Sequence, residues 1–123
     1  RQRQMCIRDR NNTSTTRKED LTHRFYTLMM DNYREHKEVI FYADKLHVSS
    51  KYLSEVVKET SGKSPKDWII DYSLLEIKEL LKNSSLNIQE ITIRTKFLNQ
   101  SALGRFFKRH TNMSPSEYRE STY

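Results

Sequence analysis

One stretch of this sequence occurs twice, and the duplication constrains the fold more than any other feature. The first copy covers residues 48–69 and the second covers residues 98–119, fifty positions further along the chain. Apolar positions match apolar positions, so the repeated feature is a packing pattern. Two copies are too few for a solenoid, and we therefore expect a duplicated small unit. Identical residues at corresponding places are Leu53 and Leu103, Lys58 and Lys108, Ser64 and Ser114, and Pro65 and Pro115.

Length and composition favour a helical chain without disulfides. The 123 residues suffice for one domain or for two small half-domains. Only two glycines and two prolines occur, which favours helices over sheets. A single cysteine, Cys6, cannot form an intrachain disulfide, which suits a reducing cytoplasm. No apolar run is long enough to span a membrane, and no secretory signal is recognisable. We therefore expect a cytoplasmic location and no association with a membrane.

The first ten residues differ from the rest of the chain. They carry four Arg and one Asp, match no structural element, and resemble read-through from a sequencing adapter. The chain also begins with Arg rather than Met. We therefore expect an incomplete or foreign N-terminus, with a disordered or foreign tail over residues 1–15 and a folded domain over residues 16–123.

Apolar periodicity and capping residues predict an all-α fold of about seven helices. The first begins at Thr16, because Thr16 and Glu19 have the spacing of a capping box. The remaining helices cover about residues 39–46, 50–60, 65–82, 88–94, 100–110 and 115–121. The short helices pair into two helix-turn-helix units, at about residues 39–62 and 87–111, and the helix at about 65–82 links them rigidly.

Particular residues are expected to begin and end these helices. Ser49 or Ser50, Ser64, Asn87 and Asn99 stand where helices begin. Gly62 and Asn112 directly follow helices and suit a left-handed backbone. The expected core residues recur on one side of each helix and on a broad face of the linking helix. They are Leu21, Phe25, Leu28, Met29, Leu53, Val56, Val57, Trp68, Ile69, Tyr72, Leu75, Ile77, Leu80, Leu81, Leu103, Phe106 and Phe107.

Positive charge is concentrated in the second unit. The net charge is +6, and residues 94–110 contain no acidic residue. Such a run can be a solvated helix face, but its position inside the second repeat favours an anionic partner. The basic residues of this run are Arg94, Lys96, Arg105, Lys108 and Arg109.

Each unit has the shape that places a helix in the DNA major groove. A short helix, a tight turn and a more polar second helix are typical of this arrangement. The second helix of each unit combines an apolar stripe for anchoring with polar residues on its other face. The linking helix of about 18 residues would be about 27 Å long, against about 34 Å for one turn of DNA. The two polar helices could therefore enter successive major grooves of one duplex.

The sequence resembles the AraC/XylS family of bacterial transcription regulators over about residues 41–119. The first half, FYADKLHVSSKYLSEVVKETSGKSPKDWI, is close to what many members carry. The second half, IQEITIRTKFLNQSALGRFFKRHTNMSPSEYR, follows the family signature, including FFKRHT and SPSEYR. Five positions depart from the pattern. They are Thr92 for the usual Ala, Lys96 for a common turn Gly, Ala102 and Leu103 for aromatic residues, and Asn112 for Gly.

The resemblance implies a role in DNA binding for residues of both polar helices. It implies contacts to bases by Lys51, Ser54, Glu55, Gln100, Ser101 and Arg105. It implies contacts to phosphates by Ser49, Ser50, Lys58, Asn99, Lys108 and Arg109. The side-chain chemistry agrees, because Arg or Lys suits guanine, Gln suits adenine and Glu accepts from cytosine N4.

Simpler interpretations stand beside these roles. Glu55 can be one half of a surface ion pair with Lys51 or Lys58. Lys58 and Lys108 can be solubilising charges. Gly104 can permit close approach to DNA, or can be a tolerated weak point in its helix.

Other classes of function have little support in the sequence. The four histidines, at 23, 36, 47 and 110, lack the spacing of metal ligands, and no phosphate loop or nucleophile motif occurs. We therefore expect no enzyme activity, no metal and no cofactor. The alternative is a helical protein-interaction module without DNA binding. The resemblance implies double-stranded DNA and RNA polymerase as partners, and an N-terminal effector or signalling domain that this chain lacks.

Overall fold

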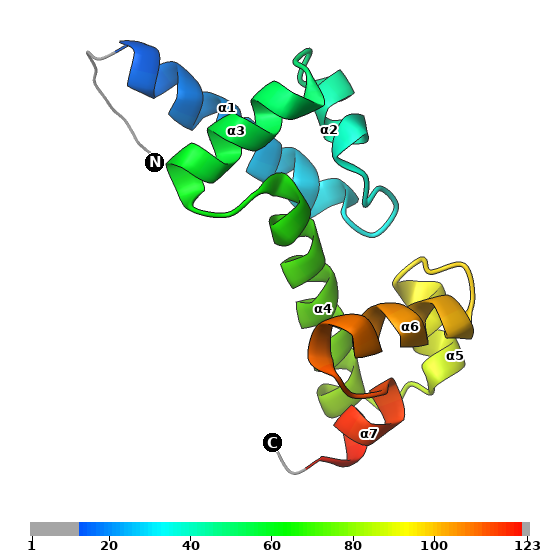
Figure 1. The fold of residues 1–123 in the computed structure, drawn as a ribbon. Coiled ribbons are helices and arrows are strands. Elements are labelled where there is room, and N and C mark those ends of the chain that lie inside the picture. The colour runs from blue at the N-terminus through cyan, green and yellow to red at the C-terminus, as the bar shows by residue number, and fades with distance from the viewer. Residues whose placement is uncertain (1–12, 122–123) are drawn as a thin grey trace. The chain divides into compact units, whose positions relative to one another are not determined.

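The structure is a computed structural model that describes residues 13–121, with side chains from Arg17 onward. Within these residues it contains seven helices and no strand, which confirms the predicted all-α class (Figure 1). Of the tail predicted over residues 1–15, the part up to residue 12, including Cys6, lies outside the described residues. No helix of residues 13–121 is long and apolar enough to cross a membrane. The helices are α1 (Thr13–Asn32), α2 (Val39–Lys45), α3 (Ser50–Ser61), α4 (Pro65–Asn83), α5 (Ile88–Arg94), α6 (Gln100–Thr111) and α7 (Pro115–Glu120).

The first helix begins earlier than the sequence predicts. α1 starts at Thr13, so Thr16 lies inside the helix rather than at its cap, and the tail predicted over residues 1–15 extends three residues too far. The reason is local composition, since residues 11–16 are all Asn, Ser or Thr. Each of these residue types is a good N-cap, so the sequence does not single out one start.

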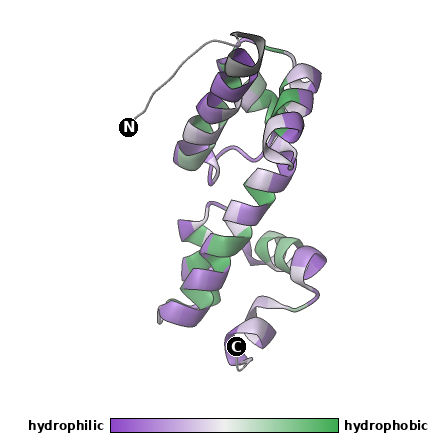
Figure 2. Cartoon of the chain, turned by 90° about the vertical axis from the view of Figure 1, so that its left-hand side faces the viewer, coloured by the Kyte–Doolittle hydropathy of each residue, from purple (hydrophilic) through white to green (hydrophobic). Residues whose placement is uncertain are grey.

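The chain divides into two compact units. Unit 1 contains the described residues 13–31 together with Glu38–Trp68, and unit 2 contains Asn32–Lys37 together with the described residues 69–121. The helix α4 starts in unit 1 and continues through Ile69 into unit 2. Both hydrophilic and hydrophobic residues occur along the helices of each unit, as amphipathic helices require (Figure 2). From the bounds of the helices and of the units, each unit contains one helix-turn-helix, α2–α3 in unit 1 and α5–α6 in unit 2.

The core of unit 1 is built by α1, α2 and α3. Phe25 and Met29 of α1 are almost completely buried, as are Tyr42 of α2 and Leu53 and Val57 of α3. The rings of Phe25 and Tyr42 meet edge to face, with their centroids 5.4 Å apart. Burial raises the pKa of the Tyr42 phenol well above its ordinary value, so this side chain stays neutral. The prediction that the methionines of α1 fill the core is confirmed for Met29 and wrong for Met30, which is 40% exposed.

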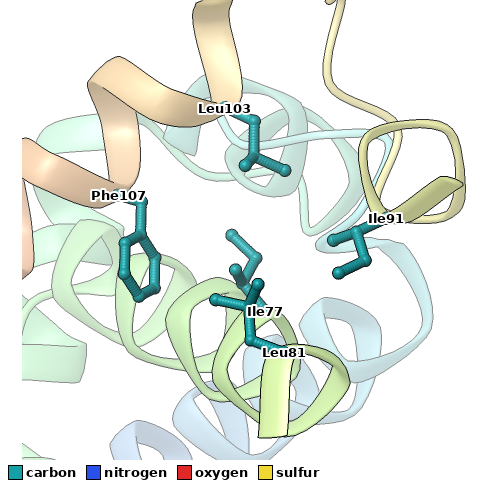
Figure 3. Close-up of a cluster of buried hydrophobic side chains, with 5 residues drawn as sticks. All are labelled: Ile77, Leu81, Ile91, Leu103 and Phe107. Atoms are coloured by element: carbon teal, nitrogen blue, oxygen red, sulfur yellow. The ribbon is translucent and has the colours of Figure 1, made fainter. Parts of the chain in front are cut away.

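The core of unit 2 is a cluster of side chains from α4, α5 and α6 that point toward one another (Figure 3). Its members are at most 2% exposed. Tyr118 of α7 adds an edge-to-face contact with the ring of Phe107, with a centroid distance of 5.5 Å. The cluster consists of Ile77, Leu81, Ile91, Leu103 and Phe107.

The segment Asn32–Lys37 between α1 and α2 belongs to unit 2. Arg34 donates from Nε to the Glu76 carboxylate at 2.7 Å and forms an ion pair with it. The Glu76 side chain is only 12% exposed, so this pair is better shielded from water than a typical surface pair. Lys37 places its ammonium group over the Phe97 ring, 4.5 Å from the centroid. Two contacts with residues distant in the sequence, Glu76 and Phe97, thus hold this segment within unit 2.

Six of the expected core residues are less buried than predicted. Leu75 is 59% exposed, because the buried residues of α4 recur every fourth position and leave Leu75 on the other side. This stripe consists of Ile69, Ser73, Ile77 and Leu81. Phe106 is half-buried rather than buried, and its ring lies against those of Phe97 and His110. Leu28, Trp68, Tyr72 and Leu80 are also only half-buried.

The two units repeat the same turn, but the turn of unit 2 is one residue longer. The first residues of α2 and α5, Val39 and Ile88, are 49 positions apart, whereas the caps Ser49 and Asn99 are 50 apart. Both turns contain a residue with positive φ, namely His47 (61°) and Lys96 (65°). The extra residue falls after Lys96, where the Leu98 side chain is 91% exposed. The predicted left-handed residues at the helix ends are confirmed, with φ of 88° at Gly62 and 65° at Asn112.

We predict that unit 2 opens more readily than unit 1. The buried Ala43 and Leu46 of unit 1 correspond to Thr92 and Thr95 in unit 2. Both threonine hydroxyls donate to carbonyls of their own helix, so they are satisfied but bury less apolar surface. Amide hydrogen exchange should therefore be faster in α5 and α6 than in α2 and α3. Equal protection of the two helix pairs would contradict this expectation.

We further predict that Lys96→Gly stabilises the chain. A left-handed backbone costs an ordinary L-residue about 1–2 kcal/mol, and glycine avoids this cost. Glycine also raises the conformational entropy of the unfolded chain, which offsets part of the stabilisation. The free energy of unfolding should therefore rise by up to about 1 kcal/mol, measured by denaturant titration. Lys96→Ala is the matched control, because it removes the same charge and keeps the unfavourable φ. A gain that is equal in both variants would mean that charge, and not backbone conformation, is responsible.

Candidate nucleic-acid interface

In unit 1 the predicted DNA-reading helix is α3. The Ser49 side chain accepts a hydrogen bond from the Tyr52 backbone N–H at 3.0 Å and so fixes the start of the helix. Its inner stripe consists of Leu53, Val56 and Val57, all buried. A second face of the helix, separate from this stripe, carries four polar residues at helical spacing. They are Lys51, Ser54, Glu55 and Lys58. Lys51, Glu55 and Lys58 are exposed and Ser54 is half-buried.

In unit 2 the corresponding helix is α6. Asn99 accepts a hydrogen bond from the Ala102 backbone N–H at 2.8 Å and caps it. Leu103 and Phe107 hold the inner side in the core. The polar residues predicted to face DNA are all exposed. They are Gln100, Ser101, Arg105, Lys108 and Arg109.

The two caps, Ser49 and Asn99, have a structural role besides their predicted role at phosphates. Each uses its side-chain oxygen as an acceptor for a backbone N–H. Each still has a donor free of that bond, the hydroxyl hydrogen of Ser49 and the amide Nδ2 of Asn99. Capping and a phosphate contact are therefore chemically compatible at both positions. Ser50 is the first residue of α3 and is half-buried.

The five basic side chains of the segment 94–110 are exposed. In residues 17–121, no carboxylate pairs within 4 Å with the five basic residues of the segment 94–110. In the same range Glu55 forms an ion pair with neither Lys51 nor Lys58, whereas its neighbour Glu59 pairs with Lys18 at 3.2 Å. The exposed charges of both helices are thus available to an external partner.

Gly104 leaves an open place on the outer side of α6. A Cβ atom built at this residue would meet no protein atom within 4 Å. The protein's own packing therefore does not require glycine here. Gly104 lies one turn from Ser101 and beside Arg105 on the polar side of the helix.

The structure adds one residue that the sequence did not point to. Gln89 of α5 accepts a hydrogen bond from Nε2 of Gln100, at a distance of 2.6 Å between the two side-chain atoms. The two residues are eleven positions apart on different helices. No local pattern signals such a pair, because it depends on how α5 and α6 cross.

Other kinds of site are less developed in the described residues. Among them, no three His, Cys, Asp or Glu side chains are grouped closely enough to hold a metal ion. A cavity of about 290 Å³ in unit 1 is lined by residues of α1, by Thr60 and Ser61 at the end of α3, and by Trp68. It therefore lies at the opposite end of α3 from the capped N-terminus.

Comparison with known proteins decides the family. The sequence model of a helix-turn-helix domain family of the AraC type matches residues 42–121. This chain belongs to the AraC/XylS family. Its members are DNA-binding transcription regulators, and the chain carries their DNA-binding domain. An uncharacterised HTH-type transcriptional regulator of Bacillus subtilis, YobQ, is 32% identical over 77 residues. The match covers 63% of this chain but only 32% of that regulator.

Solved structures agree with this AraC/XylS fold. The C-terminal domain of AraT, a response regulator from Geobacillus stearothermophilus, is 26% identical with a TM-score of 0.73. The match covers 84% of this chain and 89% of that domain. The DNA-binding domain of AdpA, a global transcriptional factor solved in complex with a target DNA, is 23% identical. Its TM-score is 0.68, and the match covers 80% of this chain and 88% of that one.

We predict that Gly104→Ala stabilises this AraC/XylS domain and weakens its binding to DNA. Alanine is favoured over glycine inside a helix by about 1 kcal/mol, and the new methyl group clashes with no protein atom. The same methyl group would stand between α6 and a closely approaching duplex. Denaturant titration and a DNA titration of the same variant measure the two effects. Unchanged DNA affinity in the stabilised variant would show that Gly104 is only a tolerated weak point.

Proposed function

We propose that α3 and α6 are the two reading helices of this domain and that each enters a major groove. The supporting observation is that both are capped amphipathic helices, anchored by an apolar stripe and exposing a polar face whose assigned charged residues form no ion pair within residues 17–121. A major groove admits one α-helix and presents a distinct pattern of donors and acceptors for each base pair. We further propose, as the sequence predicts, that the two helices enter successive grooves of one duplex.

Base recognition follows from the exposed side chains of each helix. In unit 1 we assign it to Lys51, Ser54 and Glu55, and in unit 2 to Gln100, Ser101 and Arg105. Arg105 and Lys51 can donate to guanine O6 and N7, whereas Gln100 has the donor and acceptor that adenine requires. Glu55 can accept from cytosine N4. The absence of an ion pair to Glu55 within residues 17–121 supports this role over the surface-pair interpretation.

Phosphate contacts position the domain without specifying sequence. We assign them to the cap residues, to the start of α3 and to the basic residues toward the ends of both helices. Binding through such residues releases counterions from DNA, so affinity should fall steeply as salt concentration rises. The assigned residues are Ser49, Ser50, Lys58, Asn99, Lys108 and Arg109.

The complete protein is proposed to contain a further region and to bind a protein partner besides DNA. Since the match spans about a third of the YobQ regulator, we propose that an effector or signalling region accompanies this domain in the complete protein. We propose RNA polymerase as a protein partner, a bacterial cytoplasm as the location, and no enzyme activity for this domain.

The alternative is a protein-interaction module that does not bind DNA. The observation in its favour is the exposure of two apolar side chains of unit 2, Ile93 at 63% and Leu98 at 91%. The salt dependence of DNA binding distinguishes the two functions. A module without phosphate contacts would bind DNA weakly or without a salt-dependent affinity.

We predict different effects for two substitutions on α6. Arg105→Ala should cost about 1–3 kcal/mol at one base position and relax specificity there. Lys108→Ala should weaken binding to all sequences about equally. It should also reduce the slope of log affinity against log salt concentration by about 1, the share of one phosphate contact. Selection of bound sites from a random DNA pool gives the specificity, and titrations at several salt concentrations give the phosphate contribution. A change of base preference in Lys108→Ala would contradict its assignment to a phosphate.

A further inference from the structure

Gln100, one of the residues assigned to base recognition, does not stand alone on the surface of unit 2. Its Nε2 donates to Oε1 of Gln89 at 2.6 Å, a short hydrogen bond that joins the start of α6 to α5. Both side chains are exposed, so the bond is accessible to water in the free protein. A duplex docked against α6 would exclude that water and strengthen the bond.

A glutamine amide can face a base in two ways. Its oxygen is an acceptor, and its nitrogen carries two N–H donors. Adenine presents a donor at N6 beside an acceptor at N7, whereas guanine presents two acceptors, O6 and N7. An unrestrained amide can therefore approach adenine with its oxygen and nitrogen together, or approach guanine with its nitrogen alone.

In the structure Gln89 turns its acceptor, Oε1, toward Gln100, and this arrangement admits only one of the two approaches. One N–H of Gln100 is used by Gln89, which leaves one N–H and the carbonyl oxygen for the base. One donor beside one acceptor is the complement of adenine. Guanine presents two acceptors. One of them would accept from the remaining N–H of Gln100, whereas the other would face the carbonyl oxygen of Gln100 and be repelled by it.

Resting on the proposed function, we propose that Gln89 is a positioning residue that fixes the amide orientation of Gln100. In this way α6 selects adenine over guanine at the base pair that Gln100 faces. Gln89 acts through Gln100 and does not itself contact the base. The exposed α5 residue thus becomes a determinant of DNA specificity.

Unit 1 has no equivalent of this pair. By the register of the two turns, Ile40 of α2 corresponds to Gln89, and Ser50 of α3 corresponds to Gln100. An isoleucine side chain offers no acceptor. The proposed selection of adenine therefore belongs to the half of the binding site that unit 2 reads.

The experiment first locates the base pair and then varies Gln89. Sites selected by the wild-type 123-residue chain and by Gln100→Ala identify the pair at which Gln100 discriminates. The wild-type chain should prefer adenine over guanine there by at least about five-fold, as expected for a bidentate contact. The same ratio is then measured for three substitutions, Gln89→Ala, Gln89→Glu and Gln89→Lys.

The three variants have different expected results. Glutamate only accepts hydrogen bonds, so Gln89→Glu should retain the preference for adenine. Lysine only donates, so Gln89→Lys should turn the carbonyl oxygen of Gln100 toward itself and shift the preference toward guanine. Alanine leaves the amide unrestrained, and the preference should fall by about two- to twelve-fold, equivalent to ordering one flexible side chain.

Added charge on α5 also changes affinity for every sequence, so the ratio of the two bases is the readout. Ile93 provides the matched control, because it is exposed one helical turn from Gln89 on the same helix. Ile93→Glu and Ile93→Lys carry the same charges and should leave the base ratio unchanged. An equal shift in the Ile93 and Gln89 variants would overturn the inference.

The remaining outcomes separate this inference from the proposed function. A guanine preference in the wild-type chain, or a ratio that no Gln89 variant alters, would overturn the role of Gln89 while DNA binding stands. So would an unchanged base preference in Gln100→Ala. Failure of the wild-type chain to bind DNA with salt dependence would overturn the proposed function itself, and the inference with it.

Discussion

The apolar anchoring of α3 and α6 is the interaction on which the rest of the structure depends. A helix of this length is marginal in water on its own, and its burial against a core makes it stable. Leu103 and Phe107 are completely buried beside Ile77 and Ile91, and burial of such a side chain contributes about 1.5–3 kcal/mol. The same stripe fixes the rotation of the helix. Because the inner side is held, the polar side faces outward in one orientation.

The two units hold their polar helices in this orientation with matching backbone conformations at the helix ends and with different side chains. A serine caps α3 and an asparagine caps α6, and each keeps a donor after its cap oxygen is used. A glycine ends α3 and an asparagine ends α6, because these residues tolerate the left-handed conformation best. The turn of unit 2 is a residue longer, and its backbone nevertheless closes with a hydrogen bond from Phe97 N–H to the Thr92 carbonyl. The duplicated feature is therefore a set of backbone conformations more than a set of residues.

Much of the fold and part of the site could be predicted from local patterns. The helices from α2 onward begin and end within about one residue of their expected bounds, since capping residues and periodicity act within one turn. Prediction was less successful where several residues compete or where burial depends on neighbours. Residues 11–16 offer many equivalent caps for α1, and Leu75 shares the apolar character of its buried neighbours but not their side of α4. Apart from the half-buried Ser50 and Ser54, the assigned DNA-contacting residues are exposed, and their contacts to DNA stay predictions.

By itself the sequence determined the helices and their polar faces, because these follow from interactions between residues up to four positions apart. The duplication is visible directly in the sequence as two stretches fifty positions apart. Only the tertiary structure decided the contacts between residues far apart in the chain. Arg34 meets Glu76, Lys37 meets the ring of Phe97, and Gln89 meets Gln100. Each contact depends on how packed elements cross, and that geometry is set by the complete core of the unit rather than by any single stretch.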